Sequence, residues 1–465
     1  MTPRLPITKR TGVTPAEVYL ASLCEGTFLS LWSYPTPYKD DGPARGKGQG
    51  REICDLLVVC GSQVIIFSDK HARFPTNAPL PLAWSRWFRR AIYDAAKQAW
   101  GAQRWLSSCP GRLFLDRACT QPLPVAIAPD ARFHLVVVAH GVSSRVRQHF
   151  GDSGTLMLNM VLRGADAHIA PFMIGDVGPT KPFVHVLDDE SLIALMRSRD
   201  TVTDFLDYLT KREALLRGPI LISATGEEQM LGLYLTRVNA GQEHDFTLVP
   251  DGQEPPNAIH IDQGFWEAFQ EHPGRIRQVE ADRISYAWDH LIDSFGNHAL
   301  QGTQHALTTA GIAETERILR FMARERRLYR RNLASQLMDM LETTPVTHRR
   351  IRVCLPHSPE SPHYVFVLFP KPADVPYEEY RQVRGQFLTW SCLVARHVYR
   401  DATDIVGIAT EPGIKNEMRS EDAAYFDGRM WTPELEAEAV SLQRDLNILT
   451  TFTTHRSNMV EYPDE

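Results

Sequence analysis

The chain has 465 residues, a formal net charge of −6 at pH 7 and 43% hydrophobic residues. This composition is ordinary for a globular protein, and the length predicts about two to three domains. Without an overall positive charge, any contact with nucleic acid must come from a local basic patch. No apolar run approaches the roughly 18 residues of a membrane-spanning helix, and the N-terminus lacks the apolar segment of a signal peptide. We therefore expect a cytoplasmic protein without a membrane partner.

The seven cysteines show neither a Cys-x-x-Cys spacing nor a pattern of histidine partners. Zinc sites built on cysteine have such spacings, so the cysteine pattern predicts no zinc site. Because cytoplasmic thiols are kept reduced, we expect these cysteines to form no disulfides.

Two short apolar segments, residues 54–60 and 63–70, stand out in the N-terminal part of the chain, and Gly61-Ser62 joins them. Glycine supplies the positive φ that a tight hairpin turn needs. A two-residue turn pairs Cys60 with Gln63 and continues outward from there. The sequence therefore predicts an antiparallel hairpin of two buried strands.

The register of this hairpin decides which of its polar residues share a face. With the two-residue turn, Asp55 lies opposite Ser68, and directly opposed residues share a face. Asp55, Ser68 and Lys70 then cluster on one face, and Asp69 points to the other. A three-residue turn would instead place Asp69 opposite Asp55 and turn Lys70 away. We favour the two-residue register.

This hairpin resembles the PD-(D/E)xK nuclease superfamily, which has the restriction-endonuclease-like fold. In that family a helix carries an acidic residue, the next strand carries an aspartate, and the following strand ends in Asp or Glu, any residue and Lys. Asp55 matches the strand aspartate and Lys70 matches the lysine, whereas Ser68 stands where the family usually has an acid. The resemblance covers about residues 14–140 and implies a mixed sheet flanked by helices.

The resemblance also implies a divalent metal ion that promotes phosphodiester hydrolysis. The helix acid would be Glu17 or Glu25, on a helix of about residues 14–32. Glu25 and Asp55 would bind Mg²⁺ or Mn²⁺, with Asp69 as a further ligand that compensates for the missing acid. Magnesium prefers one or two carboxylates together with water and phosphate oxygens, which such a sparse acidic site provides.

Two further hairpin residues would act in the same reaction. Lys70 would orient or activate the attacking water and stabilise the developing negative charge. Ser68 would hydrogen-bond to water or to phosphate. The alternative interpretation is that Asp55 and Lys70 form a buried ion pair with a structural role only.

A helix is predicted after the lysine strand, because residues 84–106 carry apolar side chains at helical spacing. Members of the superfamily often use polar residues of this helix to line the site, and here Lys97 and Gln98 would do so. The tryptophans of the helix are interpreted as core residues. Residues 132–140 predict a further strand of the core sheet.

The middle of the chain is predicted to be mixed in structure. Residues 141–182 carry turn signals and predict irregular structure, and a Pro- and Gly-rich stretch at 249–261 marks a domain boundary or a long surface loop. The segments between them predict two helices within 188–217, a strand at 219–223 and a helix at 226–238.

Long helices are predicted next, two within residues 265–295 and one over 312–341. The last is rich in arginine, and we expect Arg324, Arg327 and Arg331 to contact phosphate, because guanidinium groups match phosphate geometry. The alternative is a solvated helix whose arginines pair with acidic residues from elsewhere in the chain.

The C-terminal part has an α+β pattern without a catalytic motif, which suits a recognition or oligomerisation module. Its predicted elements are strands at 351–356, 364–370 and 404–412 and helices at 377–399 and 431–449.

The fold class is therefore predicted to be α/β to α+β, in four regions. These are a PD-(D/E)xK-like nuclease domain with a mixed sheet flanked by helices (1–145), a mixed α/β extension (146–255), a helical region with a basic helix (256–345) and an α+β C-terminal domain (346–465).

The function we expect is that of a Mg²⁺-dependent endonuclease acting on nucleic acid, DNA rather than RNA. Family analogy alone suggests a bacterial restriction or phage-defence effector. Ser68 favours the alternative, a catalytically degenerate protein of the same fold that binds nucleic acid or a protein partner without cutting. A homodimer is expected, because many enzymes that cut both strands work as dimers.

Overall fold

The computed structural model describes the chain apart from residues 1–6, 8, 10, 11, 13, 14, 43, 45, 47, 152, 153, 240–242, 247–253, 255, 304–311, 414–419, 456–458, 464 and 465. It is a mixed α/β structure in two compact units, Met1–Arg277 with Leu300–Gly302 and Gln278–Ala299 with Thr303–Glu465. Within the described residues, no helix is both long enough and apolar enough to cross a membrane. None of the seven cysteines forms a disulfide.

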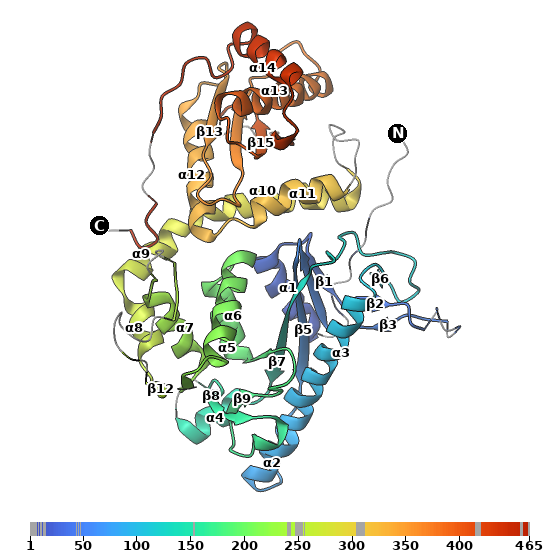
Figure 1. The fold of residues 1–465 in the computed structure, drawn as a ribbon, viewed down its shortest axis with the longest axis vertical. Helices are drawn as coiled ribbons and strands as arrows, with labels where there is room; N and C mark the ends of the chain where they lie inside the picture. The colour runs from blue at the N-terminus through green and yellow to red at the C-terminus, as the bar shows by residue number, and fades with distance from the viewer. Residues whose placement is uncertain are drawn as a thin grey trace. The chain divides into compact units, whose positions relative to one another are not determined.

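A five-stranded mixed sheet forms the centre of the first unit, in the order β1-β4-β5-β7-β10 (Figure 1). Its strands are β1 (Ser33–Pro35), β4 (Leu56–Cys60), β5 (Gln63–His71), β7 (Arg132–His140) and β10 (Val184–Asp188). The pairs β1–β4 and β4–β5 are antiparallel, whereas β5–β7 and β7–β10 are parallel. The strand predicted at 132–140 is confirmed as β7.

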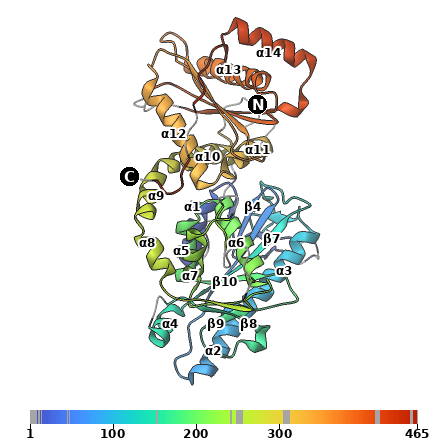
Figure 2. The same ribbon diagram turned by 60° about the vertical axis from the view of Figure 1, so that its left-hand side comes forward.

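Helices cover both faces of this sheet, which explains why its strands are almost continuously apolar. Helix α3 (Asp94–Ser108) runs along one face, and α5 (Asp189–Ser198) and α6 (Val202–Leu216) lie on the other (Figures 1 and 2). Helix α1 (Pro15–Phe28) joins α6 on that second face. There Phe28 and Phe205 contact Phe67 of β5 through their rings.

The helix predicted at 84–106 is part of a continuous helical stretch. This stretch consists of α2 (Leu80–Phe88), a π-helical turn (Arg89–Tyr93) and α3. Trp84 and Trp87 are fully buried, which confirms their interpretation as core residues. Trp87 Nε1 donates a 2.8 Å hydrogen bond to the carbonyl of Ala72, just after β5, and so ties the helix to the end of that strand.

The remainder of the first unit is more regular than predicted, because residues 141–182 contain a helix and two strands. The apolar side chains of this segment pack in one cluster with residues that are distant in the sequence, such as Leu158 with Ile222. The helix and the strands of this segment are α4 (Ser143–Phe150), β8 (Met157–Arg163) and β9 (Met173–Asp176).

The first unit has further elements outside this segment. They are β11 (Leu221–Ala224), α7 (Glu227–Thr236), β12 (Ala258–Ile261), α8 (Phe265–Glu271) and a small sheet of β2 (Tyr38–Lys39), β3 (Arg51–Glu52) and β6 (Leu113–Phe114).

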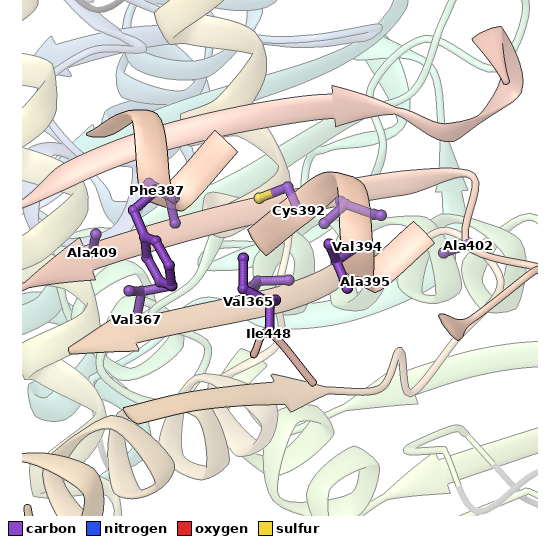
Figure 3. Close-up of a cluster of buried hydrophobic side chains, with 11 residues drawn as sticks. Val365, Val367, Phe387, Cys392, Val394, Ala395, Ala402, Ala409 and Ile448 are labelled. Atoms are coloured by element: carbon purple, nitrogen blue, oxygen red, sulfur yellow. The ribbon is translucent and has the colours of Figure 1, made fainter. Parts of the chain in front are cut away.

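The second unit is built on a four-stranded sheet, β13-β14-β15-β16, in which only β14 and β15 are parallel. The strands are β13 (Arg350–Cys354), β14 (His363–Leu368), β15 (Asp404–Thr410) and β16 (Asp422–Asp427). Helix α13 (Tyr377–Val398) connects the parallel pair and packs on it, with Phe387 and Cys392 against Val365 and Val367 in an apolar core (Figure 3).

The helices after residue 264 differ from the prediction at two places. Two helices were expected within 265–295, where the structure has α8, α9 (Pro273–Asp282) and most of α10 (Tyr286–Gln301). Residues 312–341 form two helices, α11 (Ile312–Ala323) and α12 (Arg327–Thr343), because Arg326 adopts an extended conformation between them. The other helices are α10 and α14 (Pro433–Asp445), and α9 spans the division between the two units. Thr432 caps α14 by accepting a hydrogen bond from the backbone N–H of Leu435.

Candidate functional site

The β4–β5 hairpin has the predicted two-residue register. Cys60 pairs with Gln63 and Val59 with Val64, and Gly61 takes a φ of +61° in the turn. Because side chains alternate along a strand, Ser68 and Lys70 lie on one face of β5 and Asp69 lies on the other. The polar residues of the strand are therefore divided between two faces of the sheet.

Asp55 is held firmly at the start of β4. Its backbone N–H donates to the carbonyl of Phe67, and its own carbonyl accepts from the N–H of Thr36 at 2.9 Å. Its carboxylate Oδ2 accepts a 2.7 Å hydrogen bond from the N–H of Asp69 and lies 3.5 Å from Lys70 Nζ. The side chains of Asp55 and Lys70 are 14% and 27% exposed, so the pair is accessible from solvent.

One further carboxylate, Glu52 of β3, responds to the charge of Asp55. Burial raises the pKa of Asp55, against the lowering effect of Lys70 and the hydrogen bond from Asp69. Partial desolvation raises the pKa of Glu52, and the charges of Asp55 and Glu17 raise it further, while Lys70 lowers it. Asp55 and Lys70 therefore form the contact of this site, and Glu52 belongs to its electrostatic surroundings.

Glu52 was missed in the sequence, where it precedes Asp55 by three residues in Glu-Ile-Cys-Asp. The hairpin pattern begins after it, and its own strand, β3, pairs with β2 rather than with the central sheet. The position of Glu52 only three residues before Asp55 was the feature of the sequence that could have identified it as a candidate.

The backbone beside Asp55 is strained. Thr36, which donates to the carbonyl of Asp55, has a φ of +48° and is 1% exposed. Its buried hydroxyl has no hydrogen-bond partner among the described residues. A β-branched residue in the left-handed region costs on the order of 1 kcal/mol or more, and such strain is concentrated at functional sites.

Lys97 and Gln98, which were expected to line the site from the helix after β5, differ in their contacts. Gln98 of α3 faces the site, since Ser68 Oγ lies 3.5 Å from Gln98 Oε1, a long hydrogen bond. Lys97 is 54% exposed, lies 2.6 Å from Asp94 and sits over the ring of Tyr93. Gln98 is therefore the helix residue that reaches Ser68.

The metal ligands expected from the sequence are not brought together as one group. In the described part of the chain, a single set of three potential ligands has all its donor atoms within 4.8 Å of one another, and it consists of Asp69, His71 and His140. Asp55 and Glu25 do not belong to it. Glu25 is an exposed residue of α1, and Glu17 is the residue of that helix whose charge acts on Glu52.

The Asp69 group lies where β5 and β7 end side by side. His71 pairs with His140 in the parallel ladder, and their rings stack with centroids 3.8 Å apart. Asp69 Oδ1 lies 2.7 Å from His140 Nε2, and Oδ2 lies 3.5 Å from His71 Nε2. The neighbouring thiol of Cys24 is fully buried, and burial together with Asp69 raises its pKa well above the usual range.

Two of the arginines expected to bind phosphate pair with carboxylates instead. Arg327 lies 2.7 Å from Asp289 and is buried, and Arg331 lies 3.2 Å from Asp282. Arg324 is exposed. The acids that neutralise Arg327 and Arg331 come from α10 and α9, respectively. Because these acids are far from the arginines in the sequence, the pairing could not be predicted from the sequence. We do not retain these two arginines as candidate phosphate contacts.

No protein-family model matches this chain, and no curated protein or solved structure is significantly similar to it.

Proposed function

We propose that the first unit is a metal-dependent nuclease of the PD-(D/E)xK type, with its active site at Asp55 and Lys70. The observation that carries this proposal is the contact between these two side chains, 3.5 Å apart and open to solvent, on a hairpin whose Asp strand precedes the Lys strand. An acid-bearing helix, α1, comes before the hairpin, and a helix with a polar residue near the site, α3, comes after it. This order agrees with the family pattern that the sequence resembles.

The residues of the site have the donor atoms that Mg²⁺ or Mn²⁺ prefers. Asp55 offers carboxylate oxygens, and Glu52 is near enough for the charge of Asp55 to raise its pKa. Divalent magnesium takes one or two carboxylates and fills its other positions with water and phosphate oxygens. When bound, the ion would polarise the phosphate and lower the pKa of a bound water. Glu52 would supply the second carboxylate that Ser68 does not provide.

The other side chains would position the reactants. Lys70 would turn from Asp55 towards the attacking water and the developing negative charge of the phosphate. Ser68, held near Gln98, would hydrogen-bond to the water or to a phosphate oxygen. The role of Lys70 requires that a cation takes over the charge of Asp55, which releases Lys70 for the reaction.

The test is cleavage of supercoiled plasmid, single-stranded DNA and RNA with Mg²⁺ or Mn²⁺. We expect DNA to be cut, and we expect Asp55→Asn and Lys70→Ala to lower the rate by more than roughly 100-fold, as removal of a metal ligand or of a charge-stabilising group does. Glu52→Gln should lower it as well. Matched controls are Asp166→Asn and Lys371→Ala at exposed positions, which should cut like the unmodified protein.

Cleavage that survives in Asp55→Asn would contradict this proposal. Absence of cleavage in every condition, with DNA binding retained, would support the second candidate, a degenerate nuclease-fold protein that binds nucleic acid. One observation favours that candidate, since Ser68 stands where the family usually has an acid. In that case Lys70→Ala should weaken DNA binding, and EDTA should leave binding unchanged.

A further inference from the structure

We propose that Asp69, His71 and His140 form a binding site for Zn²⁺ or a similar transition-metal ion, distinct from the Asp55–Lys70 site. Asp69 points away from the face of β5 that carries Ser68 and Lys70, and its carboxylate contacts the two histidines instead. All three donor atoms lie within 4.8 Å of one another. One carboxylate oxygen and two imidazole nitrogens are a ligand set that zinc accepts, whereas magnesium is rarely bound through imidazole.

The position in the sheet favours a ligand site. Strands β5, β7 and β10 are parallel, so their carboxyl ends meet at one edge, where open α/β sheets commonly bind ligands. His71 and His140 occupy equivalent last positions of β5 and β7 and are aligned by the ladder itself. The sheet therefore fixes both imidazoles before any ion binds, which lowers the cost of ordering the ligands.

The donor atom of Asp69 is poised for a cation. The side chain is 3% exposed, and its carboxylate lies 2.7 Å from His140 Nε2 and 3.5 Å from His71 Nε2. A buried carboxylate needs a positive partner beside it. A metal ion bound by Asp69 and the two histidines would supply that charge.

Two further carboxyl groups, at the end of β10 and the start of α5, lie near the site. Asp188 accepts hydrogen bonds from the N–H groups of Leu156 and Ser191, and Asp189 accepts one from Ser143 Oγ. Both oxygens of Asp188 and one of Asp189 are thus engaged, and the negative charge of these groups at His140 favours a cation there. His71 is 51% exposed, so the ion could enter from its side and keep a fourth position for water or an anion.

The test is titration of chelator-treated full-length protein with Zn²⁺ by calorimetry and with Co²⁺ by visible absorption, which reports imidazole coordination. We expect about one ion per chain and a higher melting temperature when Zn²⁺ is present, since an ion that binds only the folded state stabilises it. His71→Ala and His140→Ala should each weaken Zn²⁺ binding by more than roughly 100-fold. Loss of a residue that only hydrogen-bonds to a ligand costs up to about 100-fold in metal affinity, so a larger loss indicates direct coordination.

The controls separate this site from the proposed nuclease site. His348→Ala, at an exposed position of the second unit, should leave Zn²⁺ binding unchanged. Asp55→Asn should abolish cleavage but keep the Co²⁺ spectrum, so either proposal can fail alone. Absence of bound Zn²⁺ and Co²⁺ in the unmodified protein would overturn the inference, and so would binding that His71→Ala leaves intact. Because His71 is half exposed, this variant should fold, and its melting curve without metal verifies that.

Discussion

At the scale of single residues, the Asp55–Lys70 contact has two interpretations that stability measurements can separate. A structural ion pair stabilises the fold, and removing one partner of a buried pair costs about 3–5 kcal/mol. A catalytic carboxylate is instead held in unfavourable surroundings for the sake of the reaction. The raised pKa of Asp55, caused first by burial, indicates the second case, because its charged form is less favourable in the folded state than in water.

We therefore expect Asp55→Asn to change the free energy of unfolding at neutral pH by less than about 1 kcal/mol, or to raise it. Asparagine can still accept the hydrogen bond from the N–H of Asp69, and Lys70 can turn to solvent. Urea unfolding measures the change. The control is Asp204→Asn, because the side chains of Asp204 and Arg199 are each only 5% exposed, and it should cost several kcal/mol, on the order of 3–5. A comparable loss in Asp55→Asn would identify a structural pair.

A second residue, Glu325, should make the stability of the second unit depend on pH. It is 2% exposed, and burial raises its pKa to about 8, despite hydrogen bonds from Tyr364 and Ser361 that lower it. The protonated form is thus favoured in the folded state. Its 3.4 Å contact with His357 is then not an ion pair at neutral pH, since burial also lowers the pKa of that histidine.

Because the folded-state pKa lies above the unfolded one, this stability is complete below about pH 4.5 and is lost as the pH rises towards 8. We expect the unfolding free energy of the second unit to fall by about 2 kcal/mol between about pH 6.5 and pH 9, a range above the titration of His357. Glu325→Gln should remove this fall, whereas Glu342→Gln, at an exposed position, should keep it. A fall of equal size in Glu325→Gln would assign the pH dependence to another group.

At the scale of elements, the turn after β7 determines where His140 lies. Gly141 has a φ of +85°, and a Cβ there would lie 3.0 Å from the carbonyl oxygen of Ala72. Ala72 follows His71 directly, so the two strand ends that carry the histidines meet at this glycine. Only glycine adopts this conformation without strain.

Gly141→Ala should therefore lower the unfolding free energy by about 1–2 kcal/mol and weaken Zn²⁺ binding, because the strand ends must separate. Chemical denaturation and the zinc titration measure these two effects. Gly101→Ala is the matched control, since nothing lies within 4 Å of a Cβ at this helical position. It should raise stability by up to about 1 kcal/mol, as alanine does in helices. Unchanged zinc binding in Gly141→Ala would mean that the turn does not position His140.

At the scale of the whole molecule, the elements set by local patterns are as predicted, whereas several that depend on distant partners are not. The hairpin register, β7 and the α14 cap are set by short patterns, and they are as predicted. The regular elements within 141–182 were missed. Strand β8 is stabilised by pairing with β11, which comes later in the chain, and β9 pairs in turn with β8.

The sequence by itself determined which face of β5 each charged residue occupies, because a two-residue turn and the alternation of side chains leave one solution. Only the tertiary structure decided what each face meets. It placed Glu52 within the electrostatic influence of Asp55, and it aligned His140 with His71 beside Asp69. The physical reason is that parallel pairing and helix packing join segments whose separation in sequence carries no local signal.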